Sequence, residues 1–316
     1  MADMTAEQRT TQRAPARERP RRRSRGHGAL PVLLVLPAAL LLGLVLVVPM
    51  CIALWSSLFS LNILNLADQK FIGLDNYTRL MGDPAFWHAL LITGAYTLCV
   101  LVGAYALGLV TALLLRPKFP GRGAARTVAI LPWAVPQVVA VLVWVWMFDS
   151  NYGVVNYLLQ KVGIGDGHLK WLEDGQLAFV AVVVVSVWVL YPVATTMLLA
   201  GLQGIGDELY EAARMDGASR WQQFRYVTLP GLAPVNLVLV LLLVLLGFTR
   251  VVTIIYVMTG GGPGRATETL PLQTYLEAFK YHELGYASAV GTTVLILAAG
   301  FAMLYFTIAS RVLPKT

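Results

Sequence analysis

The stretch that decides the fold class is a polar interval of the chain. It reads Gly204-Ile-Gly-Asp-Glu-Leu-Tyr-Glu-Ala-Ala-Arg-Met-Asp-Gly217 and continues as Ala218-Ser-Arg-Trp-Gln-Gln-Phe-Arg-Tyr-Val-Thr-Leu-Pro230. Apolar runs long enough to cross a membrane flank it on both sides, at residues 177–202 and 231–257. The interval is therefore predicted to be a loop at the surface of a membrane protein.

The first half of this interval has the signals of a short helix. Asp207 and Glu208 suit a helix N-terminus, where negative charge meets unpaired amides, and Gly217 suits the left-handed position at which helices end. The apolar side chains on one predicted face are Ile205, Leu209, Ala212 and Ala213. A second short helix, lined by Trp221, Phe224 and Thr228, is predicted to stop at Pro230.

Two interpretations of the first short helix stay open. The two adjacent alanines leave a bare surface that the groove of a partner can approach closely, and a rim of charge would fix the register of that contact. The rim consists of Glu208, Glu211, Arg214 and Asp216. The alternative is an ordinary amphipathic linker lying on the lipid headgroups, which would have the same periodicity.

The composition of the whole chain excludes a soluble protein. Of its 316 residues, 57% are hydrophobic and 13% are charged, and the mean hydropathy is +0.67. Soluble domains carry about 25% charged residues, because a more apolar surface aggregates in water. The chain is therefore predicted to be an all-α polytopic membrane protein.

Six apolar runs are long enough to cross the hydrocarbon core as helices. They cover residues 30–58, 87–115, 126–148, 177–202, 231–257 and 286–310. Prolines inside these runs are expected to kink the helices, and they are Pro37, Pro49, Pro132, Pro136 and Pro192. The first run is about twice as long as the apolar region of a signal peptide, so it is interpreted as an uncleaved helix.

The distribution of basic residues predicts the orientation of the spans. The loop 116–125 carries three basic residues and no acidic one, and the loop 203–230 carries three arginines. The loops 59–86, 149–176 and 258–285 hold two basic residues each, although they are as long or longer. Because basic loops stay in the cytoplasm, both chain ends are predicted to be cytoplasmic.

The formal net charge of +7 comes mainly from the N-terminal tail, where eight arginines lie within the first 25 residues. A basic segment directly before a hydrophobic span is typical of a cytoplasmic anchor and does not indicate nucleic-acid binding. A role in binding lipid headgroups or a partner stays open for this tail. Residues 1–29 are predicted to be a cytoplasmic basic tail, and residues 311–316 a cytoplasmic C-terminus.

Charged residues are nearly absent from the predicted spans. Apart from Arg126 at the border of the third span, only Arg250 in the fifth is charged. Ion-coupled transporters need ionisable groups along the path of the ion, so energy is expected to arrive from outside the bilayer. Arg250 either contacts substrate or a backbone carbonyl in the bundle, or it extends its charged end to the interface.

The polar interval also resembles a known family motif. Glu211-Ala212-Ala213, Asp216-Gly217-Ala218, Phe224 and Leu229-Pro230 resemble the EAA loop of binding-protein-dependent ABC importer permeases of type I. In that family the loop forms a coupling helix in a cleft of a cytoplasmic ATPase. The resemblance assigns coupling to Leu209, Glu211, Ala212, Ala213, Asp216, Gly217 and Phe224. Gly206 departs from the pattern, since many relatives have a proline there.

Further segments resemble the carbohydrate-uptake branch of that family, of the maltose and glycerol-3-phosphate type. They are Phe71–Tyr77, Asp83–Trp87, Trp144–Phe148 with Tyr152, Gly153 and Asn156, and most of the segment 259–287. This implies a first helix and outer loop over 30–88 and a type-1 transmembrane domain over 89–310 containing the coupling loop 204–230. Relatives often have Phe-Asp where this chain has Val252-Thr253.

The resemblance implies a permease subunit in a bacterial plasma membrane that moves a sugar or related polyol by alternating access. Its partners would be a second permease, two ATP-binding subunits, an extracytoplasmic solute-binding protein and membrane lipid. The segment Gly260–Thr267 lacks the lysine of a phosphate-binding loop, so ATP would be bound by the partner. That segment is interpreted as a turn or as a contact for the solute-binding protein.

The candidates for the substrate path lie mid-span near Pro192. They are Trp188, Tyr191 and Thr195 or Thr196, with Arg250 and Thr253 on the next span. The alternative for any single aromatic is the interfacial belt that polytopic proteins share. Two rival functions remain: a secondary transporter or facilitator without an ATPase, and a membrane-embedded enzyme. An enzyme would need catalytic or metal-binding clusters, and the outer acids Asp149, Asp166, Glu173 and Asp174 look like solvated loop residues.

Overall fold

The computed structural model describes residues 29–164 and 167–312, which divide into two units, residues 1–50 and 51–316. Each unit is described by itself. The described part of the first unit is helical: α1 (Ala29–Leu42), a π-helical turn (Gly43–Val47) and the start of α2 (Val48–Ser56). The helical stretch Leu33–Ser56 is 24 residues long and apolar enough to cross a membrane.

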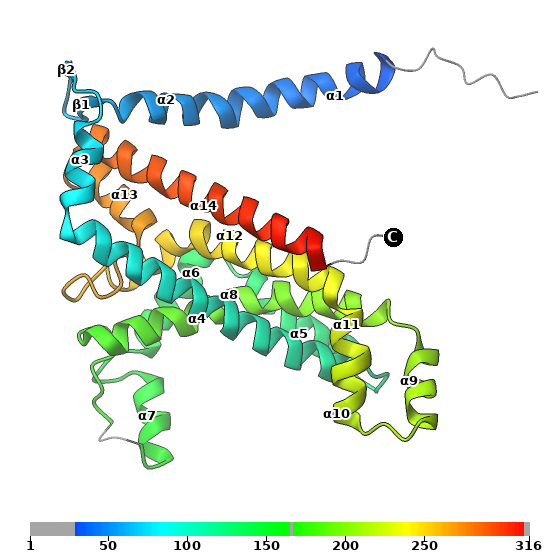
Figure 1. The fold of residues 1–316 in the computed structure, drawn as a ribbon. Coiled ribbons are helices and arrows are strands. Elements are labelled where there is room, and N and C mark those ends of the chain that lie inside the picture. The colour runs from blue at the N-terminus through cyan, green and yellow to red at the C-terminus, as the bar shows by residue number, and fades with distance from the viewer. Residues whose placement is uncertain (1–28, 165–166, 313–316) are drawn as a thin grey trace, which may run out of the picture. The chain divides into compact units, whose positions relative to one another are not determined.

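The second unit is mainly helical (Figure 1). Its elements are β1 (Phe59–Asn62), β2 (Asn65–Phe71), α3 (Asp75–Gly82), α4 (Pro84–Leu115), α5 (Arg122–Ala134), α6 (Gln137–Met147), α7 (Val154–Lys161), α8 (Gly175–Gln203), α9 (Asp207–Met215), α10 (Arg220–Gln223), the π-helical turn η3 (Phe224–Thr228), α11 (Leu229–Gly231), α12 (Ala233–Met258), α13 (Leu270–Phe279) and α14 (Leu284–Val312). The prediction of a mainly helical polytopic fold is confirmed.

Four helices of the described chain are long and apolar enough to cross a membrane, and two bent pairs bring the number to six if each pair is one span. The third predicted span, 126–148, is not one helix, because α5 and α6 meet at an angle of 94°. The break lies at Val135, which is extended (φ −74°, ψ 134°) before Pro136. A residue before proline is pushed out of the helical region by contact with the proline ring, which explains the bend.

The loops predicted to lie on the outer side contain structure that the sequence analysis did not predict. β1 and β2 form an antiparallel hairpin, in which Phe59 pairs with Phe71 and their rings lie 5.3 Å apart. Asn76 of α3 donates hydrogen bonds to the carbonyl oxygens of Ser57 (2.8 Å) and Phe59 (3.0 Å). The hairpin is therefore fastened to the segment that leads into α4.

A polar network fastens α3 to the start of α14. The Tyr286 hydroxyl donates to an Asp83 carboxylate oxygen at 2.8 Å, and Arg79 forms an ion pair with Glu283. The Arg79 guanidinium also lies 4.1 Å from the centre of the Tyr286 ring. Nearby in α13, burial raises the pKa of the Glu277 carboxyl.

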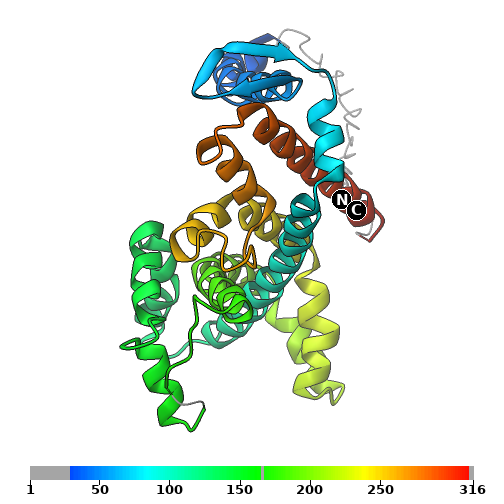
Figure 2. The same ribbon diagram turned by 90° about the vertical axis from the view of Figure 1, so that its left-hand side faces the viewer.

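The core of the second unit forms around α8, which contacts α4, α5, α6 and α12 (Figure 2). α4 and α8 approach closely at Gly108, where an added Cβ would lie 2.5 Å from Cβ of Ala194. Small residues at helix crossings let backbones approach, and this is a main source of packing energy in a bilayer. The Tyr96 hydroxyl of α4 also donates to Ser186 Oγ of α8 at 2.6 Å.

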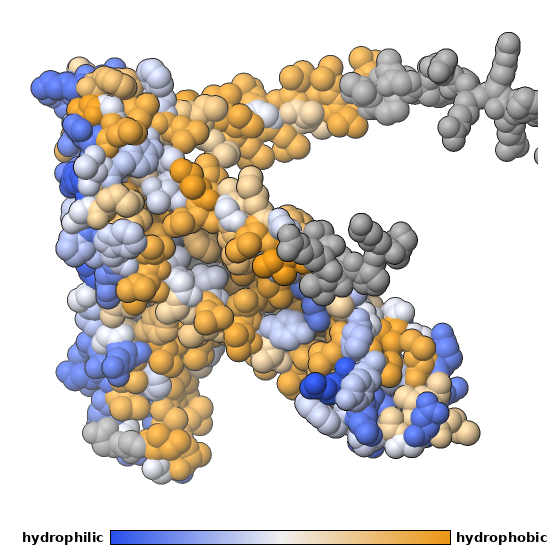
Figure 3. All heavy atoms as spheres, in the orientation of Figure 1, coloured by the Kyte–Doolittle hydropathy of each residue, from blue (hydrophilic) through white to orange (hydrophobic). Residues whose placement is uncertain are grey.

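Hydrophobic side chains cover the middle of the second unit on the face seen in Figure 3. Hydrophilic side chains gather at the end that carries α3 and at the opposite end, which carries α9 and α10. Two polar ends on either side of an apolar middle are the pattern of a membrane-spanning bundle. α9 and α10, which are part of the polar interval, therefore lie at one end of the spans.

The crossing at Gly108 yields a test of this packing. Gly108→Ala should lower stability by about 1–3 kcal/mol, because the added methyl group overpacks the contact with Ala194. Gly94→Ala on the same helix is the matched control, since nothing lies within 4 Å of its added Cβ. Thermal unfolding of the purified protein, followed by tryptophan fluorescence, would measure both. Equal losses in the two variants would contradict the close crossing.

Candidate coupling surface and substrate path

The helix α9 ends as the sequence predicts. Gly217 has a positive φ of 77°, which favours glycine, and its amide donates to the Arg214 carbonyl oxygen at 3.0 Å. The Ala218 amide donates to the Ala213 carbonyl oxygen at 2.9 Å. These two bonds form a Schellman motif, which satisfies the last carbonyl groups of the helix. At the other end, Gly206 is the N-cap residue and has no side chain to cap the helix.

Tyr210 anchors α9 to the bundle. Its hydroxyl lies 3.0 Å from Thr228 Oγ1, and the guanidinium of Arg116, directly after α4, lies 4.0 Å from the centre of its ring. Arg116 also forms an ion pair of 3.4 Å with Asp207. The sequence analysis did not single out Tyr210 for a role. The available signal was its position three residues after Asp207, which puts both side chains on one helix face.

The opposite surface of α9 is exposed. Leu209 is 53% exposed and Met215 is 88% exposed, although both are large apolar residues. Ala212 is also exposed, and Ala213 is half-buried. The charged and terminal candidates Glu211, Asp216 and Gly217 are exposed as well. The structure therefore places most of the predicted coupling residues on an accessible surface.

The predicted single apolar face of this helix is wrong for Ile205. This residue precedes α9 and is buried, with its side chain against Gly231 of α11. Leu209 and Ala212 are exposed instead. The periodicity misassigned Ile205 because the helix begins only at Asp207, after Gly206.

The second half of the polar interval is one continuous helical segment made of α10, η3 and α11. Ser219 caps it, since its hydroxyl accepts from the Gln222 amide and its own amide donates to the Gln222 side chain. The candidate Phe224 is half-buried, with its ring 5.6 Å from that of Trp221.

Pro230 does not stop this segment, contrary to the prediction. It lies in α11, where the backbone is already helical from Arg220, and the helix runs on to Gly231. The bend of 69° comes after that, before Ala233. The predicted helix end is therefore displaced toward α12.

Of the candidates for the substrate path on α8, Thr195 and Thr196 line one cavity, and Trp188 and Tyr191 are not part of its lining. Trp188 is half-buried and its ring lies edge-on to that of Trp144 of α6, at 5.7 Å. Tyr191 is half-buried, and Thr195 is buried and donates to the Tyr191 carbonyl oxygen at 3.0 Å. The hydroxyl of Thr195 therefore keeps only its acceptor sites for a ligand.

Of the remaining path candidates, the structure describes Thr196 and Thr253 with their side chains and Arg250 in its backbone alone. Thr196 is exposed and donates to the Pro192 carbonyl oxygen at 2.8 Å. Thr253 of α12 is half-buried. Arg250 falls within α12, but its side chain lies outside the described part of the chain. Its two interpretations, as a substrate contact or an interface residue, stay predictions.

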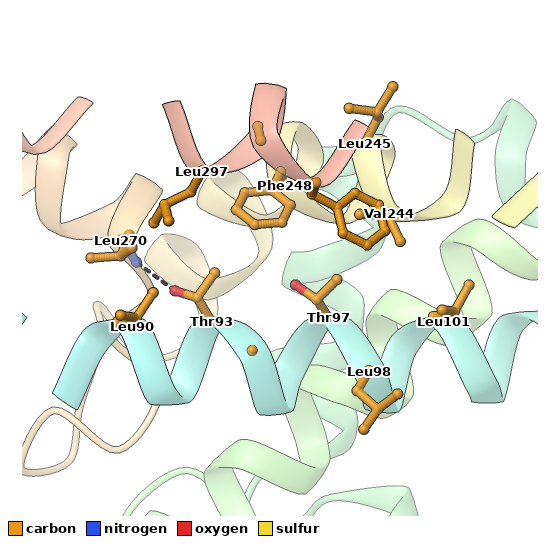
Figure 4. Close-up of a pocket in the computed structure, with 13 residues that line it drawn as sticks. Leu90, Thr93, Thr97, Leu98, Leu101, Val244, Leu245, Phe248, Leu270 and Leu297 are labelled. Carbon is orange, nitrogen blue, oxygen red and sulfur yellow. Dashed lines mark hydrogen bonds between the residues drawn. The ribbon is translucent and has the colours of Figure 1, made fainter. Parts of the chain in front are cut away.

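A cavity of about 330 Å³ lies between α4, α12 and α14 (Figure 4). Its lining is nearly all apolar, with Leu98, Phe248 and Leu297 among the wall residues. Thr93 Oγ1 accepts from the Leu270 amide at 2.8 Å, so it is already engaged. A sugar needs several hydroxyl and amide partners, and this lining does not supply them.

Three of the four acidic residues predicted to lie on the outer side have structural tasks. Asp174 caps α8 by accepting from the amides of Gln176 and Leu177, both at 2.9 Å. Asp149 accepts from the Asn151 amide, a bond that lowers the pKa of its carboxyl. Glu173 pairs with Lys170 at 3.1 Å, and Asp166 lies outside the described residues. Among the residues described, no group of three or more His, Cys, Asp or Glu could hold a metal ion.

The glycine-rich segment after α12 folds into a turn closed by its own hydrogen bonds. Thr259 Oγ1 and Thr267 Oγ1 lie 2.7 Å apart, and Thr267 Oγ1 donates to the Gly262 carbonyl oxygen at 3.0 Å. His88 Nε2 lies 3.2 Å from the Arg265 carbonyl oxygen, which joins the turn to α4. A turn packed on the bundle was one of the two roles predicted for this segment.

The comparison with protein families and the comparison with curated proteins agree on one family of transport proteins. Residues 104–314 match the family described as "Binding-protein-dependent transport system inner membrane component". The chain is 36% identical over 282 residues to a trehalose/maltose transport system permease protein of Thermococcus litoralis, covering 88% of this chain and 93% of that protein. It is also 36% identical over 283 residues to a sulfoquinovosyl glycerol transport system permease protein of Agrobacterium fabrum, covering 90% and 91%.

A solved structure has the same fold. A bacterial ABC transporter involved in the import of the acidic polysaccharide alginate matches with a TM-score of 0.75 and 20% identity, over 90% of this chain and 96% of that one. A bacterial alginate ABC transporter in complex with an alginate pentasaccharide-bound periplasmic protein matches with a TM-score of 0.74.

The resemblance that the sequence analysis drew from the polar interval is therefore confirmed at the level of the family. The family match begins within α4 and runs through the later spans, and the curated relatives extend it over most of the chain. Its members are transporter permeases and not enzymes. The chain belongs to the binding-protein-dependent transport system inner membrane components, and it is a multi-pass inner-membrane permease of an ABC importer.

Proposed function

We propose that this permease imports a sugar or related polyol and that α9 is the element through which ATP hydrolysis drives it. The observation that carries the proposal is the two-sided character of α9. One side exposes Leu209, Ala212 and Met215, and the other is held to the bundle by Tyr210. A helix with one exposed and one anchored side can bind a partner on its exposed side and transmit a displacement to the bundle through its anchored side.

The exposed side of α9 has the chemistry of a docking surface. Leu209 and Met215 supply apolar area, and Ala212 leaves room for a close approach. The charges of Glu211 and Asp216 at its edge would set the register of a contact. An exposed apolar patch with a polar rim marks an interaction site in soluble and membrane proteins alike. We assign it to a separate ATP-binding subunit.

The anchored side of α9 would transmit movement to two spans. Through Arg116 the helix is tied to the end of α4, and through Thr228 it is tied to the segment that leads into α12. Displacement of α9 would thus move both spans as rigid bodies and alternate the access of the path.

The assembly and its orientation belong to the same proposal. The excess of basic residues in the loops 116–125 and 203–230 supports cytoplasmic ends and a cytoplasmic α9. A second permease, two ATP-binding subunits and an extracytoplasmic solute-binding protein would complete the importer. Residues 30–88 would form the first span with its outer loop, and 89–310 the transmembrane domain.

The proposed substrate class rests on the relatives. One is named for trehalose and maltose transport, another for sulfoquinovosyl glycerol transport, and a solved transporter of the same fold imports alginate. Trp188, Tyr191, Thr195, Arg250 and Thr253 remain the proposed path residues, since aromatic faces and hydroxyls suit sugars.

Ala212→Trp tests the docking surface. The bulky side chain should block the approach of the ATP-binding subunits and lower their co-purification about tenfold, for a cost of about 1–3 kcal/mol in the contact. Ala124→Trp is the matched control, because Ala124 is exposed on α5, outside the polar interval. Quantified co-purification from detergent extracts gives the result. Retention of the ATP-binding subunits at the normal level by Ala212→Trp would contradict the assignment.

Tyr210→Ala tests the transmission of movement. It removes the hydrogen bond to Thr228 and the ring under Arg116, so uptake per ATP hydrolysed should fall about tenfold while the ATP-binding subunits stay bound. Tyr210→Phe keeps the ring and should have a smaller effect. Tyr226→Ala serves as control, because Tyr226 is 69% exposed. Uptake and hydrolysis are measured together in proteoliposomes. Unchanged coupling in Tyr210→Ala would refute the role of this anchor.

The source of energy separates this proposal from a secondary transporter. In proteoliposomes containing the whole importer, sugar uptake should stop when ATP is withdrawn and persist when ionophores collapse the ion gradients. The physical reason is the absence of acidic residues from the predicted spans, which leaves no carboxylate path for a coupling ion. Uptake by this chain alone, insensitive to ATP, would support the rival.

A further inference from the structure

A second cavity lies at the end of the bundle that carries α9. It has a volume of about 260 Å³ and is lined by the last residues of α4 and α8 and the first turns of α5. Arg126 is the one charged residue in its lining. The sequence analysis treated Arg126 only as a charge at the border of a span.

The guanidinium of Arg126 is without a partner in the described structure. Its Nε and Nη2 atoms are both buried, and neither has a hydrogen-bond acceptor among the described residues. Leaving such donors unpaired in a buried site is costly. These two atoms form one edge of the guanidinium, and that edge is the fork that binds two oxygens of a phosphate or carboxylate at once.

The rest of the lining selects the kind of ligand. Gln203 supplies a carboxamide, whereas the hydroxyls of Thr195 and Thr196 already donate to backbone carbonyl oxygens. Ile130 and Leu199 are part of an otherwise apolar wall. A polar sugar would find few partners here, but an anionic head joined to an apolar chain matches both the fork and the wall.

The surrounding charge also favours an anion. The segment 116–126 carries Arg116, Lys118, Arg122 and Arg126 and no acidic residue. Under the proposed orientation this segment faces the cytoplasmic leaflet, where anionic lipid headgroups gather at basic pockets between spans.

We propose that the cavity at Arg126 is an oxyanion site, and that the phosphate of an anionic phospholipid in the cytoplasmic leaflet occupies it. The Nε–Nη2 edge of Arg126 binds two phosphate oxygens, Gln203 adds a donor, and the lipid body lies along Ile130 and Leu199. A soluble anion, such as the acidic group of a sugar, has the same chemistry at the fork and is the other possible source.

Native mass spectrometry of the purified importer, equilibrated with vesicles with and without phosphatidylglycerol, tests the proposal. Arg126→Gln should lower phosphatidylglycerol retention about tenfold, which is the usual loss of affinity when a bidentate, charge-assisted hydrogen bond is removed. Arg126→Lys keeps the charge but not the fork, so it should lose an intermediate amount. Lys118→Gln removes one charge from the same segment outside the cavity and should retain lipid normally.

A second arm identifies the source of the anion. Inorganic phosphate and glucuronate are titrated into lipid-depleted importer while its thermal unfolding is followed. Protection of the unaltered protein but not of Arg126→Gln supports the site and assigns it to a soluble anion. The proposal is overturned if Arg126→Gln retains phosphatidylglycerol normally and neither anion raises the unfolding temperature of the unaltered protein more than that of Arg126→Gln. Neither readout depends on ATP hydrolysis, so failure here leaves the proposed transport function untouched.

Discussion

The close crossing of α4 and α8 is the constraint on which the rest of the second unit depends. A bilayer offers no hydrophobic gain for packing one apolar helix on another, so the pair must be held by tight contact. Gly108 against Ala194 provides that contact, and the Tyr96–Ser186 hydrogen bond adds a polar link. α5, α6 and α12 also pack on α8, so their positions depend on this crossing.

Both helices of this pair end close to α9. α8 leads into it through Gly204–Gly206, and α4 ends at Arg116, which contacts Tyr210 and Asp207 of α9. Under the proposed function, a force on α9 would therefore reach a stiff pair of spans and not a single flexible one. This explains physically why a polar interval with few contacts of its own can control a large apolar bundle.

The sequence predicted those features that are set by local chemistry. Run lengths located the spans, and Gly217 marked the end of α9 because its conformation needs glycine. Features that depend on distant contacts were missed. The link from Arg116 to Tyr210 joins residues far apart in the chain, and the β1–β2 hairpin has a strand, Asn65–Phe71, that is exposed along its whole length and carries no buried pattern. The 94° bend before Pro136 was predicted only as a kink.

The central claim is that the exposed side of α9 faces the cytoplasm and is covered by an ATP-binding subunit. Labelling of Met215→Cys with a membrane-impermeant maleimide tests it most directly, in a chain whose exposed Cys51 and Cys99 are replaced. The account predicts labelling in inside-out vesicles stripped of the ATP-binding subunits and protection when those subunits are restored. Labelling from the outer side of intact cells, or equal labelling with and without the subunits, would contradict it.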